Sequence, residues 1–181
     1  MDPRAEEVLR FWFDETPEED HFEGGEAFDA RCRDRLGALH DQATAGALDD
    51  WAAEPRAALA LVILLDQLSR NLDRNLPGAF AHDAKALEIA AAVIERGHDE
   101  ALSVPERKFL YMPFQHIEDE AGQERGLILF ARMQDEKSLI YMAEHYRIIR
   151  RFGRFPHRNQ VLGRTSTAEE IEFLTQPGSS F

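Results

Sequence analysis

The stretch that decides the fold reads PRAALALVILLDQLSR and covers residues 55–70 of this 181-residue chain. Proline suits the first position of a helix, because the N–H that it lacks would have no partner there. The run from Ala57 to Leu65 is apolar on all sides, which is typical of a helix packed in the middle of a fold. Its nine residues are fewer than half of the roughly 20 that a membrane span needs. Residues 55–70 therefore predict a central buried helix and no membrane span.

Amphipathic and capped segments lie on both sides of this central helix. Phe28, Cys32, Leu36 and Leu39 recur at i, i+4, i+8 and i+11, which places them on one helix face. Asp2 is a predicted N-cap, Thr167 and Glu170 have the spacing of a capping box, and Gly153 is the predicted stop of a helix. No segment reads convincingly as a strand. We expect the acidic segment around Pro17 to be a loop. The predicted helices cover 3–14, 26–45, 55–70, 83 to about 97 with Asp83 as its cap, a segment opened by Ser103, 113 to about 133, 136–152, and a short segment after Thr167.

Composition restricts the class of protein. With 44% hydrophobic and 30% charged residues, the chain has ordinary globular usage, and its length predicts one helical domain over residues 1–181. The single cysteine, Cys32, excludes an intramolecular disulfide framework. Its arginine neighbours would lower its pKa, but we interpret it as a bystander. The amino terminus lacks the regions of a secretory signal, so we expect a cytoplasmic protein, and we expect no cofactor.

The strongest binding signal is RIIRRFGRFPHRNQVLGR, residues 147–164, which contains six arginines, one histidine and no carboxylate. The chain has a formal net charge of −13, or −19 without these six arginines. Such a field repels a polyanion, so we exclude nucleic acid and expect a small anion instead. The arginines at 147–151 lie near a predicted helix end and are interpreted as surface residues. The predicted anion-binding arginines are Arg154, Arg158 and Arg164.

A second polar cluster ends the central helix and consists of Asp66, Arg70 and Asn71. Asp66 and Arg70 are four residues apart and share a helix face, so they can form a buried ion pair. The same placement would also put both side chains on the wall of a ligand groove. The sequence leaves these two interpretations open.

A third polar cluster follows Pro113. On one continuous helix, His116, Asp119, Glu120 and Gln123 would form a single stripe, which is typical of either a pocket wall or a solvated helix start. His116 with Asp119 or Glu120 has the spacing of two metal ligands, and His145 or His157 would add a third. A compact motif such as His-Glu-x-x-His is missing, so we predict no metal site. The candidate catalytic residues are His116, His157 and Asp119.

Together these strings resemble a known family. The chain has VLRFWF at 8–13, DQLSRN at 66–71, HIEDEAGQER at 116–125 and FGRFPHRNQVLGR at 152–164, and with these it resembles the DUF924 family of bacterial and eukaryotic proteins of unknown function. The resemblance covers nearly the whole chain. It implies an all-α fold, a tetratricopeptide-like right-handed array of antiparallel helix pairs, and it implies no reaction. The polar positions that match are Asp66, Arg70, Asn71, His116, Glu118, Asp119, Gln123, Arg154, His157, Arg158, Asn159 and Arg164.

We interpret these polar positions as one groove on the concave face of such an array. The leading hypothesis is a site for a small anionic ligand or an acidic peptide end of a partner protein, with arginines holding the anion and amides orienting it. An alternative is a hydrolase that uses histidine and carboxylate acid–base chemistry, with or without a metal, on a phosphate or acyl substrate. A third is a scaffold with internal ion pairs. The chain has neither a Gly-x-Ser-x-Gly motif nor a phosphate-binding loop, and it leaves the oligomeric state open.

Overall fold

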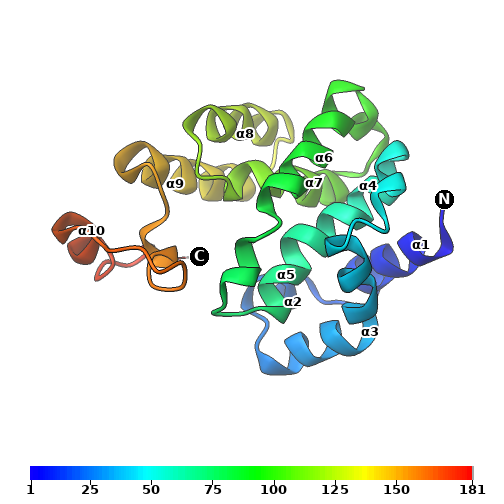
Figure 1. The fold of residues 1–181 in the computed structure, drawn as a ribbon. Helices are drawn as coiled ribbons and strands as arrows, with labels where there is room; N and C mark the ends of the chain where they lie inside the picture. Colours follow the sequence, from blue (N-terminus) through cyan, green and yellow to red (C-terminus); the bar gives the residue numbers. More distant parts are fainter. Residues whose placement is uncertain (181) are drawn as a thin grey trace. The chain divides into compact units, whose positions relative to one another are not determined.

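The computed structural model describes residues 1–180, apart from the side chain of Glu23, and every regular element in this range is helical (Figure 1). The predicted all-α class is therefore confirmed, whereas the tetratricopeptide-like arrangement stays a prediction. The α-helices are α1 (Pro3–Leu9), α2 (Glu18–Glu23), α3 (Glu26–Thr44), α4 (Pro55–Val62), α5 (Ser69–Leu72), α6 (Asp83–Glu95), α7 (Val104–His116), α8 (Glu120–Arg132), α9 (Glu136–Phe152) and α10 (Ala168–Phe173). Two π-helices, η1 (Arg10–Asp14) and η3 (Ile63–Leu68), and four 3₁₀ segments, η2 (Asp49–Ala53), η4 (Pro77–Phe80), η5 (His98–Ala101) and η6 (Pro156–Arg158), complete the described elements.

The chain folds into two compact units. The first unit consists of residues 1–74 and 78–113, and the second consists of residues 75–77 together with the chain from Phe114 onward. Helix α7 begins in the first unit and ends in the second, with the boundary after Pro113. The single domain expected from the length stays a prediction.

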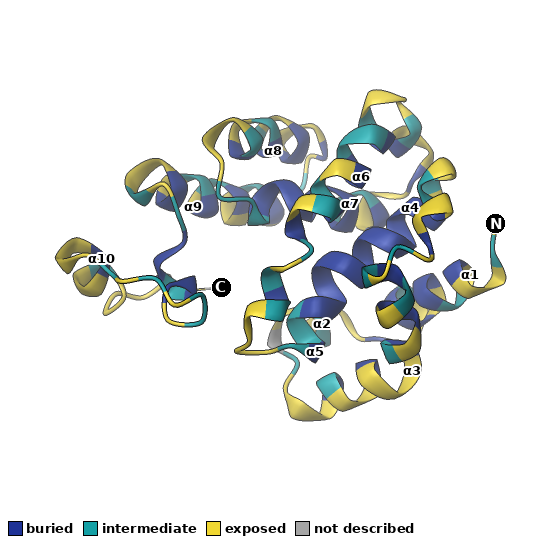
Figure 2. Ribbon diagram, in the orientation of Figure 1, coloured by how far each residue is buried: buried dark blue, intermediate teal, exposed yellow. Residues whose placement is uncertain are grey.

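The central helix of the first unit is the one that residues 55–70 predict. Helix α4, η3 and α5 follow one another without a break, and every residue from Ala57 to Ser69 is buried (Figure 2). Helices α1 and α6 and segment η2 pack against α4, while α3 packs against η3 and α5. Neighbours on several sides explain why this helix has no polar stripe until Asp66.

Two parts of the predicted helices are π-helical rather than α-helical. Segment η1 follows α1 inside the predicted helix 3–14, and η3 interrupts the central helix. A π-helix closes its hydrogen bonds five residues apart instead of four, is rare, and is often found at functional sites. Both segments overlap strings that carry the family resemblance, and no periodicity in the sequence indicated them.

Local capping signals agree with the structure at several ends. Asp2 accepts a hydrogen bond of 2.8 Å from the N–H of Arg4 at the start of α1. Thr167 and Glu170 form the complete capping box of α10. Helix α9 has the predicted bounds and ends at Gly153, whose φ of 68° lies in the left-handed region that favours glycine.

Three predictions about helix boundaries are wrong. The segment after Pro17 is helix α2 rather than a loop, because acidic residues occupy its first turn, where they favour helix formation. The predicted helix start at Pro113 is wrong because this proline lies inside α7, and α8 begins only at Glu120. Asp83 is the first residue of α6 rather than its cap, since its carboxylate binds Arg70 instead.

Two further features concern the single cysteine and the apolar character of the helices. Cys32 is fully buried, and burial raises the pKa of its thiol to about 12, so its arginine neighbours do not activate it. Within residues 1–180, no helix combines the length and the apolar character that crossing a bilayer requires.

Candidate functional site

Arg70 lies in a buried cluster of charges in the first unit. Its guanidinium donates two hydrogen bonds of 3.0 Å to the carboxylate of Asp83 and lies 3.2 Å from Asp66 Oδ1. Gln67 donates a further hydrogen bond to Asp66. Burial opposes the charge of Arg70, but the two carboxylates outweigh it and raise the pKa of the guanidinium. Arg70 therefore has a structural role, because it pairs with two carboxylates. Asp66 and Arg70 form the ion pair that was one of the two interpretations of their spacing in the sequence.

Asn71 also has an internal partner in the first unit. Its amide donates a hydrogen bond of 2.9 Å to Asp29 on α3, and Arg74 donates to both oxygens of the same carboxylate at 2.6 and 2.8 Å. These bonds connect the end of α5 to α3. The predicted ligand residues of the first unit thus connect its helices to one another.

A serine–histidine pair in the first unit is unsuited to nucleophilic catalysis. Ser69 Oγ lies 2.9 Å from His40 Nε2, but its own proton is donated to the carbonyl of Leu65 at 2.7 Å. His40 Nε2 must then donate to the serine oxygen, so the imidazole cannot remove a proton from that oxygen. Ser69 is also fully buried.

In the second unit, the first three arginines of residues 147–164 are surface residues, as predicted. Each forms an ion pair with a glutamate at 2.8–3.2 Å, and the side chains on both sides of these pairs are largely exposed. Such pairs contribute little to stability. The pairs are Arg147 with Glu144, Arg150 with Glu120, and Arg151 with Glu169.

Arg164 fixes the turn that follows α9. It donates hydrogen bonds of 2.5 and 2.9 Å to the two oxygens of Glu118 and one of 3.1 Å to the carbonyl of Phe155. Glu118 also accepts a bond of 2.7 Å from the N–H of Phe155. Burial raises the pKa of Glu118, but the hydrogen bonds from Arg164 and Phe155 outweigh it and lower the pKa overall. We call Glu118 and Arg164 the brace of Phe155.

Arg154 and Asn159 are held by α10. Arg154 donates hydrogen bonds of 2.6 and 2.8 Å to the two oxygens of Glu170, and the amide of Asn159 donates to Glu170 at 3.3 Å and to Ser166 at 3.0 Å. The bonds from Arg154, more than any other contact, lower the pKa of Glu170 to about 2. Arg154 thus has a carboxylate partner within the protein.

The side chains that gather around Phe155 form a different kind of site. His145 lies with its ring centroid 5.6 Å from that of Phe155, and His157 lies at the same distance. His116 is 6.3 Å from His145, and the guanidinium carbon of Arg158 lies 4.5 Å from the Phe155 ring centroid. His116 and His157 are half-buried, whereas His145 and Arg158 are buried. We call these four residues the histidine cluster.

His145 is the neutral member of this cluster. Its Nδ1 donates a hydrogen bond of 2.8 Å to the carbonyl of Tyr141, and Gln115 Nε2 lies 3.4 Å from its Nε2, which is then the acceptor. Burial lowers the pKa of His145 to about 3, and the positive charges of His116, Arg158 and His157 act in the same direction. The cluster therefore places two further imidazoles and one guanidinium near one buried neutral imidazole.

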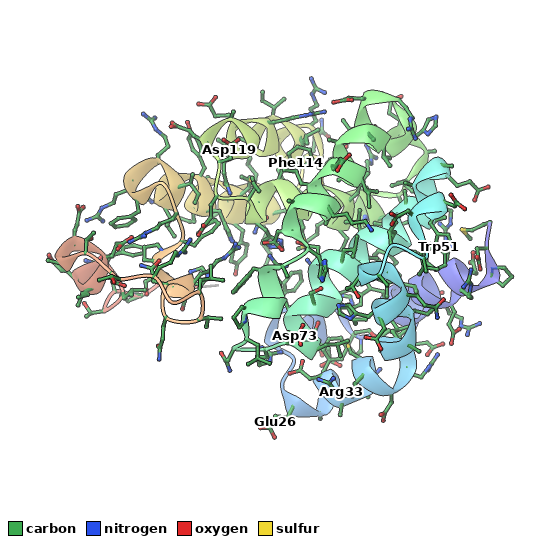
Figure 3. The ribbon with its side chains drawn as sticks, in the orientation of Figure 1. Glu26, Arg33, Trp51, Asp73, Phe114 and Asp119 are labelled. Carbon is green, nitrogen blue, oxygen red and sulfur yellow. The ribbon has the colours of Figure 1, made fainter. Side chains whose placement is uncertain are left out.

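Gln123 and Asp119 fix the connection from α7 to α8. The buried amide of Gln123 donates hydrogen bonds of 2.7 and 2.9 Å to the carbonyls of Gln115 and Ile117, on either side of His116. Asp119, labelled with Phe114 in Figure 3, accepts a hydrogen bond from the N–H of Gly122 and caps α8. The prediction that His116, Asp119, Glu120 and Gln123 form one stripe on a single helix is therefore wrong. Helix α7 ends at His116, and α8 begins at Glu120.

Within the second unit, the structure brings together some of the predicted site residues. His116, His157 and Arg158 lie in the histidine cluster, whereas Asp119, Gln123, Arg154, Asn159 and Arg164 form caps and ion pairs around it. Sequence reasoning considered His145 as a metal ligand and as a neighbour of the arginine-rich segment, but included neither His145 nor Gln115 among the predicted ligand-binding residues. Across residues 1–180, no three His, Cys, Asp or Glu side chains group closely enough to hold a metal ion. The groove shared by all three polar clusters stays a prediction.

Two open depressions of the surface are lined by other residues. One open depression in the first unit is lined by Asp49, Asp50, Arg96 and His98, among others, and another in the second unit lies beside the loop from α8 to α9. Neither is lined by any predicted site residue.

Comparison with known proteins gives a family but no activity. The sequence profile of DUF924, described as a bacterial protein of unknown function, matches residues 8–178. A solved structure of a protein of unknown function from Agrobacterium tumefaciens is 39% identical to the chain, with a TM-score of 0.90 over 95% of this chain and 97% of that one. No functionally curated protein matches the sequence.

Proposed function

The chain belongs to the DUF924 family, and because this family has no assigned function, we propose from the geometry that the second unit binds a small anion at the histidine cluster. The ligand is an inorganic or organic phosphate or a carboxylate, including the carboxylate at the end of a peptide. The observation that carries the proposal is the gathering of His116, His157 and Arg158 around Phe155 and the neutral His145.

Electrostatics supports an anion in particular. Burial is the main cause of the low pKa of His145, and positive charge on His116, Arg158 and His157 acts in the same direction. An anion bound among these side chains would accept hydrogen bonds from imidazole and guanidinium donors. The rest of the chain has a strongly negative charge, which favours a small ligand over a polyanion.

The arrangement favours binding over hydrolysis. His145 is neutral and weakly basic, and Ser69 and Cys32, two side chains of the nucleophile type, are buried and inactivated by their surroundings. His116 and His157 remain the half-buried acid–base groups of the cluster. Phe155, which connects the members of the cluster, is fixed on both sides of its backbone by the brace. A rigid, preorganised cluster is suited to capture of a ligand.

Thermal unfolding with phosphate, with a peptide that has a free carboxyl end and with its amidated form tests this proposal. A ligand at 100 times its dissociation constant adds about 2.7 kcal/mol to the free energy of unfolding, which raises the Tm of a chain of this size by about 5–11 °C. We expect His157→Gln and Arg158→Gln to lose this increase. Arg147→Gln, which changes an exposed arginine of the same segment, is the matched control and should keep it.

Two results would contradict the proposal. One is a Tm that neither phosphate nor the free peptide end raises. The other is an increase that persists unchanged in both His157→Gln and Arg158→Gln. Because Arg158 is buried and its replacement affects packing, the half-buried His157 provides the decisive variant.

A further inference from the structure

A second unusual group of side chains lies in the first unit, where η1 meets α2. Trp12, in the π-helical η1, is fully buried, and its indole Nε1–H has no hydrogen-bond acceptor among residues 1–180. Leaving a buried donor in this state destabilises the folded chain, and folded proteins leave few of them. The other indole of the chain differs, because Trp51 Nε1 donates a hydrogen bond of 3.1 Å to Asp2.

The imidazole of His21, which stacks on Trp12, has a buried acceptor atom, Nδ1, to which no described residue donates. His21 lies with its ring centroid 4.6 Å from that of Trp12 at an interplanar angle of 17°. Its Nε2 is 2.8 Å from the carbonyl oxygen of Trp12. A carbonyl only accepts, so Nε2 carries the hydrogen and the lone pair of the neutral ring is on Nδ1. That Nδ1 is buried and has no partner. Burial lowers the pKa of His21, which favours this neutral form.

Aromatic side chains surround the two stacked rings. Phe109 presents an edge to Trp12 at 5.6 Å and to His21 at 5.1 Å, and Phe13 lies 5.5 Å from Phe109. Phe22, which is 52% exposed, stacks with Phe109 at 6.3 Å. Flat apolar walls of this kind favour a planar ligand, because aromatic faces and edges pack well against a ring.

The two atoms without partners limit the chemistry of that ligand. A carboxylate has only acceptors and cannot serve His21 Nδ1, whereas an ammonium group has only donors and cannot serve Trp12 Nε1. A carboxamide or lactam edge has a C=O beside an N–H and complements both. We propose that Trp12 and His21 form a second binding site, for an uncharged planar ring with a carboxamide or lactam edge whose C=O accepts from Trp12 and whose N–H donates to His21.

Helix α2 provides the route of entry to this site. It has six residues, fewer than the 12–15 at which an isolated helix is even marginally stable in water, and it lies between Pro17 and Gly24. Besides the ring contacts of His21 and Phe22, its ion pairs are Asp20 with Arg31 at 3.3 Å and Glu18 with Lys108 at 3.5 Å. Both involve exposed carboxylates or cations, and such pairs are weak. Displacement of α2 would therefore expose Trp12 without unfolding the central helix.

Proton NMR of the indole N–H groups tests this second site directly. Benzamide is the probe, because it is planar and uncharged and has both a donor and an acceptor, and benzoate is the control with acceptors only. We expect benzamide to move the Trp12 indole proton downfield with saturation, while the Trp51 proton stays in place as an internal reference. Trp51→Phe assigns the two resonances. Benzoate should leave both unchanged.

A variant of His21 shows whether benzamide binds through hydrogen bonds or only through packing against aromatic rings. His21→Phe keeps a flat ring on Trp12 but removes the acceptor, so benzamide affinity should fall at least tenfold while the Trp51 resonance shows that the fold is kept. The proposal is wrong if benzamide causes no saturable shift, as expected if solvent alone serves the two atoms. It is also wrong if benzamide and benzoate shift Trp12 equally, or if His21→Phe binds benzamide as tightly as the unchanged protein.

Discussion

Arg70 in the first unit and Arg158 in the second are each followed by an asparagine, but their contacts differ. Arg70 is enclosed by the carboxylates of Asp66 and Asp83. Arg158 lies on the ring of Phe155 in a cluster whose other members are imidazoles. The difference teaches that the contacts of an arginine, rather than its presence in a polar string, indicate which role should be tested for it.

The largest expected effect comes from removing the cation of the first cluster. Arg70→Met leaves Asp66, which is fully buried, and Asp83 without their shared counter-charge, so we expect the free energy of unfolding to fall by about 3–5 kcal/mol. Urea denaturation measures the loss. The control is the triple variant Asp66→Asn, Arg70→Met, Asp83→Asn, which also removes the two negative charges and should recover part of it. A loss below 1 kcal/mol in Arg70→Met would mean that the ion pairs do not stabilise the first unit.

A smaller effect, in the second unit, should appear as pH dependence. His145 has a pKa of about 3 in the folded chain and near 6.5 when unfolded, so the unfolded state binds more protons between these values. The contribution of the neutral His145 to the free energy of unfolding is therefore fully present above pH 6.5 and is lost as the pH falls toward 3. At pH 5 this loss is on the order of 2 kcal/mol. His21 and His40, whose pKa values are also lowered, change stability in the same direction.

The variant His145→Asn isolates this contribution, because asparagine keeps a donor near the carbonyl of Tyr141 but does not titrate. Urea denaturation at several pH values between 7 and 5 gives the slope of the free energy of unfolding. The slope should be shallower in His145→Asn than in the unchanged protein. Equal slopes would show that His145 is not the buried neutral group described above. The low pKa of Glu170 does not interfere, since it affects stability only at pH values near its unfolded pKa and below.

The smallest effect is expected for Arg147, an arginine at the surface. Arg147 is 74% exposed and pairs with Glu144, which is 48% exposed. Exposed pairs of this kind contribute less than about 0.5 kcal/mol, so Arg147→Gln should change the free energy of unfolding by no more than that. Urea denaturation beside Arg70→Met provides the comparison. A loss above 1 kcal/mol would show that exposure does not distinguish the arginines of this chain.

The sequence predicted what depends on neighbours along the chain. The N-cap Asp2, the capping box of Thr167 and Glu170, and the glycine after α9 each involve residues within four positions, so their patterns can be read directly. The buried face of α3 and the enclosed central helix follow from periodicity for the same reason. These signals were sufficient for the all-helical class.

The sequence could not predict what depends on distant partners. Arg164 binds Glu118, which is 46 residues away, and Arg70 binds Asp83 across a turn, so their ion pairs are not visible in any local pattern. Pro113 gave a false helix start, because proline is typical of helix starts but is tolerated here inside α7. The histidine cluster was found only in part, since His145 comes from the middle of α9 and its neighbours come from other elements.

The π-helix η3 has a consequence for how this chain can change in length. A π-helical segment contains one more residue than the α-helical turn it replaces, and each added residue turns the following side chains by about 100°. Arg70 is the second residue after η3, so its direction toward Asp83 depends on the number of residues in Ile63–Leu68 as well as on their identity. Substituting one apolar residue for another there changes the packing, but deleting one would redirect the guanidinium. Residue count is thus a constraint on this helix, and insertions and deletions there are more damaging than conservative substitutions.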